Sequence, residues 1–199
     1  MTTSAKLLYV AILVGLFSAG LLLAKYTPWQ DKGVADAGYG NLGGDFKLNS
    51  ATGEVKLEDF RGQLVLMYFG FTSCPDVCPA ELATIAASMR QLTPGLEAQI
   101  QPLFVSVDPE RDTLDNLAKY SAYFHPKMLG ITGSIDTLDQ IVKSYGAYYR
   151  QIPLENSALG YTVDHTSRVY LIGREGQLIS TIAHGTSAND MTALLKLHL

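Results

Sequence analysis

The sequence predicts an α/β domain with a mixed central sheet flanked by helices, preceded by one N-terminal transmembrane helix. Two observations support the domain: strand-like and helix-like patterns alternate from residue 45 onward, and a tight turn joins a late pair of strand-like runs. Alternating strands and helices build a parallel sheet, and a hairpin adds antiparallel strands to it. A third observation, the uncharged apolar segment 7–24, supports the transmembrane helix. A chain of 199 residues suits one domain with a small appendage.

The N-terminal segment reads as a membrane anchor. Residues 7–24 carry no charge, and Lys6 and Lys25 flank them. About 18 residues at about 1.5 Å each reach about 27 Å, enough to span the hydrocarbon core of a bilayer. A cleaved signal peptide is the alternative, but its apolar part is usually shorter and no A-x-A cleavage site is evident. We therefore predict an anchor over residues 1–26, and a flexible tether over residues 27–44, which are rich in Gly, Ala and Asp.

The domain itself is predicted over residues 45–199. Two of its runs are apolar almost throughout, which is typical of strands buried on both faces. The predicted elements are a hairpin (46–48 and 54–57), strand 63–71, helix 79–92, strand 100–107, helices 113–124 and 135–145, strands 166–172 and 177–183, and a final helix capped by Ser187 or Asn189. Such a sheet, with helices on both faces and a cysteine pair directly after the first long strand, is thioredoxin-like.

The two cysteines of the chain carry the first chemical signal. Cys74 and Cys78 lie at the connection between the predicted strand 63–71 and the predicted helix 79–92. Their i, i+4 spacing places both on one face, about one turn apart. A helix N-terminus favours negative charge and therefore thiolate character. Because the pair sits at a junction of elements, we interpret it as a redox-active pair able to form a disulfide, or as part of a metal site.

The spacing leaves both chemistries open. Thiol oxidoreductases usually have two residues between their cysteines, whereas three separate Cys74 from Cys78. This gap still permits a disulfide and also lets both sulfurs face one metal ion. Soft thiolates suit Cu(I), zinc or iron–sulfur clusters. A structural zinc site usually has four ligands, and an iron–sulfur cluster is usually bound by four cysteines. Two thiolates and one imidazole would form a three-coordinate site, which Cu(I) accepts.

The chain has four histidines, and position selects one of them. His198 is next to the C-terminus, His125 ends a predicted helix, and His184 is a turn residue at a strand end. His165 lies in the loop that enters the late hairpin, and in a thioredoxin-like fold that loop lies against the helix N-terminus bearing the cysteines. We predict His165 as the third ligand, with the neighbouring Asp164 holding the loop or the imidazole.

Four ordered motifs give the chain a family resemblance. They are 69–79 (FGFTSCPDVCP), 105–113 (VSVDPERDT), 124–133 (FHPKMLGITG) and 163–166 (VDHT). Together they resemble the Sco/SenC copper proteins of cytochrome oxidase assembly. The resemblance covers roughly residues 45–199, and the anchor and tether are similar to the family's layout.

The resemblance implies a ligand set and a role. Cys74, Cys78 and His165 would bind Cu(I) or Cu(II), with an additional ligand for the oxidised ion. The family matures the Cu(A) centre in subunit II of cytochrome c oxidase, by giving copper or by reducing its cysteines, and other copper chaperones would be further partners. A single-pass anchor in the cytoplasmic (inner) membrane would hold the domain in the periplasm. Asp108, in the second motif, is expected to be a buried carboxylate that organises its loop.

Alternatives to a copper chaperone remain at this point. A thiol–disulfide reductase and a redox- or copper-sensing protein would use the same cysteines, so enzymatic activity is left open. Thioredoxins carry a cis-proline at the loop where His165 sits, and no proline is near His165 in this sequence, which favours metal binding. A peroxiredoxin would need a Pro-x-x-x-Thr/Ser-x-x-Cys motif, which is missing. The net charge of −4 and the lack of a basic run argue against nucleic acid.

Overall fold

The computed structural model describes residues 39–155 and 157–199. The predicted anchor and residues 27–38 of the predicted tether lie outside the described residues. Within the described ranges, no helix is both long and apolar enough to cross a bilayer. Residues 39–44 contact the domain: the Thr181 N–H donates to the Tyr39 hydroxyl (2.9 Å), and the Gly43 N–H donates to the Ser144 carbonyl (2.8 Å).

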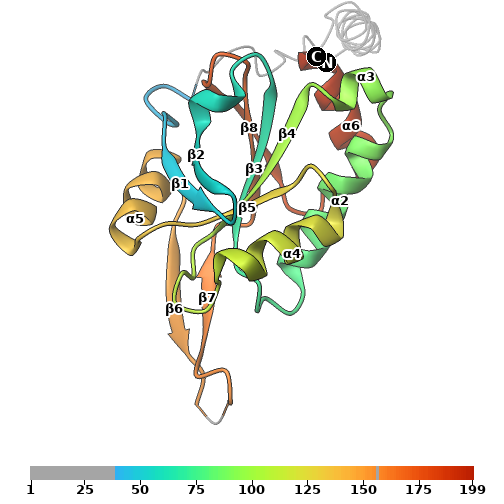
Figure 1. Cartoon of the computed structure of the whole chain (residues 1–199). Coiled ribbons are helices and arrows are strands. Elements are labelled where there is room, and N and C mark those ends of the chain that lie inside the picture. Colours follow the sequence, from blue (N-terminus) through green and yellow to red (C-terminus); the bar gives the residue numbers. More distant parts are fainter. Residues whose placement is uncertain (1–38, 156) are drawn as a thin grey trace, which may run out of the picture. The chain divides into compact units, whose positions relative to one another are not determined.

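A five-stranded mixed sheet forms the centre of the domain (Figure 1). Its order is β5-β4-β3-β8-β9. Strands β5, β4 and β3 are parallel, β8 is antiparallel to β3, and β9 is antiparallel to β8. The strands are β3 (Leu64–Gly70), β4 (Ile100–Ser106), β5 (Leu129–Ile131), β8 (Arg168–Ile172) and β9 (Leu178–Ala183). Every residue of β3 and β4 is buried, which explains their continuous apolar runs. The predicted thioredoxin-like sheet is confirmed.

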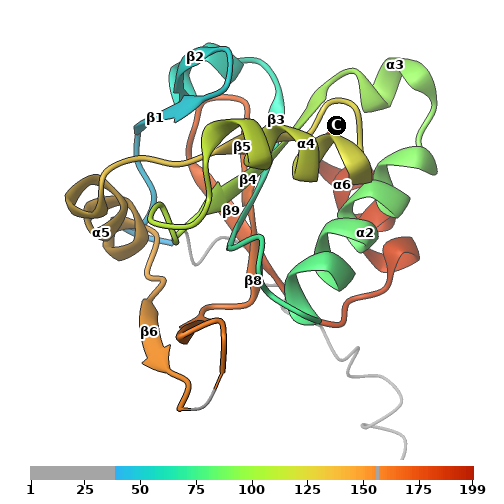
Figure 2. The same cartoon turned by 60° about the horizontal axis from the view of Figure 1, so that its bottom comes forward.

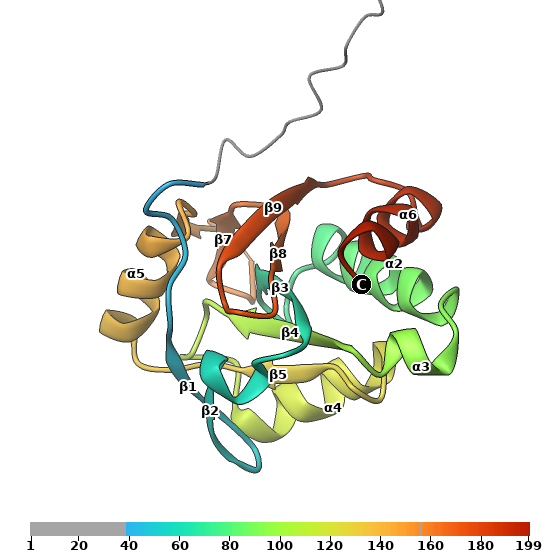
Figure 3. The ribbon, with the colours of Figure 1, turned by 90° about the horizontal axis from the view of Figure 1, so that it is seen from above.

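Helices cover both sides of this sheet. Figure 3 shows α2 and α6 together on one side and α5 on the other, and α2 also contacts α4. The helices are α2 (Val77–Arg90), α3 (Pro94–Glu97), α4 (Leu114–Phe124), α5 (Ile135–Ser144) and α6 (Ala188–His198), with a 3-10 turn η1 (Leu57–Phe60). Thr113, Ser134 and Ser187 cap α4, α5 and α6 by accepting a backbone N–H, which decides the predicted choice between Ser187 and Asn189.

Two small hairpins lie beside the central sheet. The first, β1 (Lys47–Ser50) with β2 (Gly53–Lys56), matches the prediction. The second, β6 (Tyr149–Pro153) with β7 (Tyr161–His165), was not predicted, and it projects from the body of the domain (Figures 1 and 2). The prediction that His165 lies in a loop is therefore wrong: it is the last residue of β7 and pairs with Tyr149.

The topology brings three segments to one edge of the sheet. Because β3 and β4 are parallel, the loops after their carboxyl ends meet at the same edge. Strand β8 is antiparallel to β3, with Val169 opposite Tyr68, so the chain that enters β8 from β7 arrives at this edge too. The cysteine motif, the loop 107–113 and His165 are thus neighbours, although they are far apart in the sequence.

Candidate metal centre

The cysteines occupy the connection between β3 and α2. Cys74 lies in the turn and is partly buried, whereas Cys78 is in the first turn of α2 and fully buried. The backbone N–H of Cys78 donates to Cys74 Sγ over 3.4 Å. The predicted proximity of the two sulfurs is confirmed, but only Cys78 belongs to the helix.

The last residue of β3 makes room for the buried thiol. A Cβ atom on Gly70 would lie 2.9 Å from Cys78 Sγ and 2.8 Å from the Phe104 ring. Any larger side chain would therefore push the thiol or the ring out of place. The glycine lets the sulfur of Cys78 pack directly on the strand.

His165 approaches the cysteines from β7. Its Nε2 lies 3.4 Å from Cys78 Sγ, and its Nδ1 lies 3.2 Å from the Thr166 carbonyl oxygen. The Thr166 carbonyl can only accept, so it fixes the orientation of Nδ1, and Nε2 is the ring nitrogen that faces the sulfurs. The ring of His165 also meets Tyr68 and Phe71 edge-on, with centroids 6.0 and 5.9 Å away. The buried imidazole is therefore oriented as a metal ligand needs.

The three side chains form one cluster. The ligand atoms of Cys74, Cys78 and His165 all lie within 4.8 Å of one another. Metal–sulfur and metal–nitrogen bonds of about 2.0–2.3 Å in a trigonal arrangement would place such atoms about 3.8 Å apart. The observed spacing needs little adjustment to surround one ion. Over residues 39–155 and 157–199, this is the group of histidine, cysteine and acidic side chains that fits a metal.

The two thiols differ in their affinity for protons. A hydrogen bond from Cys78, helped by His165 and by the backbone N–H groups of Cys78 and Asp76, lowers the pKa of Cys74 to about 3 against the opposing effect of burial. The pKa of Cys78 is raised, first by its interaction with Cys74 and then by burial. The pKa of Cys74 is thus lowered and that of Cys78 raised, so the thiolate character predicted for the pair concentrates on Cys74.

The comparisons with known proteins agree with this geometry. A family model described as SCO1/SenC matches residues 34–199. The chain belongs to the SCO1/SenC family.

Relatives within the family occur in mitochondria and in bacteria. The chain is 43% identical over 159 residues to the bovine mitochondrial SCO2 homolog, covering 78% of this chain and 59% of the bovine protein. It is 32% identical over 194 residues to an SCO2-like protein of Rickettsia conorii, covering 96% of this chain and 94% of that protein. The crystal structure of Arabidopsis thaliana ScoI with copper bound has a TM-score of 0.71 and 34% identity, covering 78% of this chain and 96% of that one.

Of the two predicted roles of Asp164, holding the loop or holding the imidazole, the contacts fit the first and not the second. In this SCO1/SenC chain, Asp164 accepts a hydrogen bond from the Tyr148 hydroxyl (3.0 Å) and lies 3.9 Å from Arg150. These contacts join β7 to the start of β6, while the Thr166 carbonyl is the hydrogen-bond partner of the imidazole Nδ1. The sequence alone does not reveal a backbone partner of this kind.

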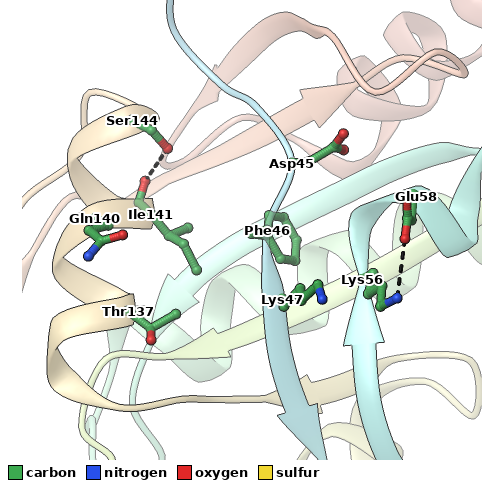
Figure 4. Close-up of a pocket in the computed structure, with 9 residues that line it drawn as sticks. All are labelled: Asp45, Phe46, Lys47, Lys56, Glu58, Thr137, Gln140, Ile141 and Ser144. Carbon is green, nitrogen blue, oxygen red and sulfur yellow. Dashed lines mark hydrogen bonds and ion pairs between the residues drawn. The ribbon is translucent and has the colours of Figure 1, made fainter.

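The other described histidines stand apart from the cluster. His184 Nδ1 lies 2.7 Å from the buried carboxylate of Glu81, and His125 Nε2 lies 3.3 Å from Glu97. A separate hollow of about 510 Å³ lies between the first hairpin and α5 (Figure 4). Its lining includes Phe46 and Ile141 but none of the three candidate ligands. The metal-ligand chemistry is therefore concentrated at the cysteine edge.

Proposed function

We propose that this chain binds copper and serves cytochrome c oxidase assembly, by delivering copper to the Cu(A) centre of subunit II or by reducing its cysteines. The observation that carries the proposal is the cluster of Cys74, Cys78 and His165. Membership of the SCO1/SenC family supports it, as does the copper bound to Arabidopsis ScoI. Since the chain spans 59% of the bovine relative, the partners of that longer protein are part of the proposal.

The donor set explains why copper is the expected cargo. Two thiolates and one imidazole are soft and borderline ligands, which suit Cu(I). The aromatic rings around His165 and the burial of Cys78 exclude water from one side of the site. Cys74 is partly exposed, which leaves that sulfur accessible for exchange of the ion with a partner, including another copper chaperone. Copper binds to thiolates, so Cys78 must lose its proton, and a disulfide between the two cysteines would block binding.

Metal reconstitution tests this proposal. The purified full chain, reduced and titrated with Cu(I) without oxygen, should bind one copper per chain, and Cu(II) should give a visible thiolate charge-transfer band. The matched control is the Cys74→Ser/Cys78→Ser variant, which should bind neither ion at the site. Stoichiometric copper binding in this variant would overturn the assignment.

A second function, thiol–disulfide reduction, is favoured by the asymmetry of the cysteines. Cys74 is partly exposed with a pKa of about 3, and Cys78 is buried with a raised pKa. This is the arrangement of an attacking thiolate and a resolving thiol. A Cys78→Ser variant should trap a mixed disulfide between Cys74 and an oxidised peptide carrying the two cysteines of a Cu(A) site. Absence of trapping, with copper transfer to the reduced peptide intact, would favour the chaperone role.

We also propose that residues 7–24 anchor the chain in the cytoplasmic membrane, with the domain in the periplasm. The support is the length and the uncharged character of the segment. Confinement near a membrane oxidase would raise the effective concentration of the copper site. The full chain should stay in the membrane fraction after carbonate extraction. A mature N-terminus near residue 25 would instead show a cleaved signal peptide.

A further inference from the structure

The loop between β4 and α4 contacts both halves of the candidate metal site. On the cysteine side, the buried carboxylate of Asp112 accepts hydrogen bonds from the Thr72 backbone N–H (3.0 Å) and the Thr72 hydroxyl (2.5 Å). The Ser106 hydroxyl at the end of β4 donates to the same carboxylate (2.5 Å). Thr72 precedes Cys74 by two residues, so Asp112 ties the start of the cysteine turn to the end of β4.

On the histidine side, the same loop holds the first residue of β7. Arg111 Nη1 donates to the Tyr161 carbonyl (2.9 Å), and the guanidinium lies 3.8 Å from the centroid of the Tyr161 ring. Arg111 Nε donates to the fully buried Asp108 (2.5 Å), and the Tyr161 hydroxyl donates to the other oxygen of that carboxylate (2.7 Å). Asp108 therefore organises its loop, as the sequence predicted, and also orients both partners of the contact.

The histidine side depends on such contacts because its hairpin lacks support from the sheet. β6 and β7 form a two-stranded sheet of their own, with no ladder to the central five strands. Isolated two-stranded hairpins are marginally stable at best. Other described attachments exist, such as the Tyr149 hydroxyl on Asp139 (2.7 Å), but that one is exposed. His165 lies four residues after Tyr161 on the same strand, so the position of Tyr161 controls that of the imidazole.

We propose that the loop 107–113 is a brace that sets the distance between the cysteine and histidine halves of the copper site. In this brace, Asp112 positions the cysteine turn, and Arg111 with Asp108 positions the strand that carries His165. These are positioning residues, since none of them belongs to the ligand cluster. The inference rests on the proposed function for its copper readouts, but the brace itself is a property of the metal-free chain.

Loosening the histidine side of the brace should affect the affinities for Cu(I) and Cu(II) differently from loosening its cysteine side. Arg111→Lys keeps the charge but loses the planar fork and the stacking on Tyr161. With the histidine strand loosened, Cu(II) affinity should fall about 10–100-fold, as for loss of other supporting contacts at metal sites, while Cu(I) stays on the two thiolates. The Cu(II) charge-transfer band and hyperfine coupling should shift. Asp112→Asn should lower the affinity for both ions, because it loosens the turn that carries the cysteines.

The matched control is Arg174→Lys. Arg174 also holds backbone carbonyls, of Gly62 and Leu199, but it does so at the opposite end of β3. This variant should leave both copper affinities and the spectrum unchanged. Tyr161→Phe removes the hydroxyl bonds to Asp108 (2.7 Å) and Glu110 (3.4 Å) but keeps the contacts with Arg111. It should therefore lower Cu(II) affinity by a smaller factor, and it replaces Arg111→Lys as the test variant if Arg111→Lys does not fold.

A readout without metal separates the brace from the proposed function. In the metal-free full chain, amide hydrogen exchange over residues 161–166 should be faster in Arg111→Lys and unchanged in Arg174→Lys. Unchanged exchange, or equal losses of Cu(I) and Cu(II) affinity in Arg111→Lys, would overturn the brace. Failure of the unmodified chain to bind copper through its cysteines would overturn the proposed function instead, and hydrogen exchange would still decide the brace.

Discussion

The cysteine turn and the histidine strand reach the same site by different physical means. The cysteine turn continues directly from β3, whose seven residues are all buried, and Cys78 packs on Gly70. His165 lies 87 residues after Cys78, on a hairpin whose strands are largely half-buried or exposed. One half of the site is therefore held by core packing, whereas the other combines a few polar contacts with the packing of Val163 and of the His165 ring. The difference teaches that the two halves should respond differently to mutation.

The first prediction has the largest expected effect and removes the histidine half. His165→Ala should lower Cu(II) affinity by at least about 100-fold, because losing a ligand should cost more than losing a supporting contact. Cu(I) should be retained on the thiolates, since imidazole matters more to the harder ion. Competition titrations with chelators specific for each ion measure both affinities. His198→Ala, at the end of α6, is the control, and equal losses of both ions in His165→Ala would contradict the comparison.

The second prediction compares packing in the two regions. Gly70→Ala should lower the free energy of unfolding by about 1–3 kcal/mol, because the new methyl group meets Sγ and the Phe104 ring in a filled core. Gly160→Ala, near the tip of the second hairpin, meets no atom within 4 Å and should cost only the strain of its φ of +70°, about 1 kcal/mol. Urea denaturation measures both. A larger loss of unfolding free energy for Gly160→Ala than for Gly70→Ala would show that tight packing also stabilises the hairpin, and would contradict the comparison.

The third prediction concerns the charge within the cysteine half. A pKa of about 3 keeps Cys74 as a thiolate between pH 5.5 and 7.5, so its alkylation rate should hardly change over this range. An ordinary thiol with a pKa of about 8.5 would slow by about 100-fold over the same interval. Mass spectrometry of the reduced, metal-free chain after iodoacetamide pulses gives the rate. Cys78 should stay unreactive, since its pKa is raised and its side chain is buried.

The matched variant for this experiment is Cys78→Ala. It removes the hydrogen bond that most lowers the pKa of Cys74, so the alkylation rate should regain its dependence on pH. A rate at Cys74 that falls about 100-fold in the unmodified chain would show that its thiol is ordinary and that the proton is not held on Cys78.

Local sequence patterns determined the cysteine half of the molecule. The apolar runs of β3 and β4 predicted buried strands, and Ser187 was one of the two predicted caps of the last helix, because such signals act between residues close in the chain. The cysteine spacing and the junction of strand and helix located the thiols in the same way. His165 was selected by fold analogy and by resemblance, since no local pattern around it indicates a ligand.

Tertiary structure decided the histidine half and its supports. The hairpin β6–β7 escaped prediction because its strands lie off the main sheet and bury few side chains, so they lack a clean alternation. The contacts of Arg111 with Tyr161 and of Asp112 with Thr72 join residues 50 and 40 positions apart. The sequence signalled them only as the motif 105–113, interpreted as shaping the fold through Asp108. Which side chains such a motif holds depends on the topology that gathers three loops at one edge of the sheet.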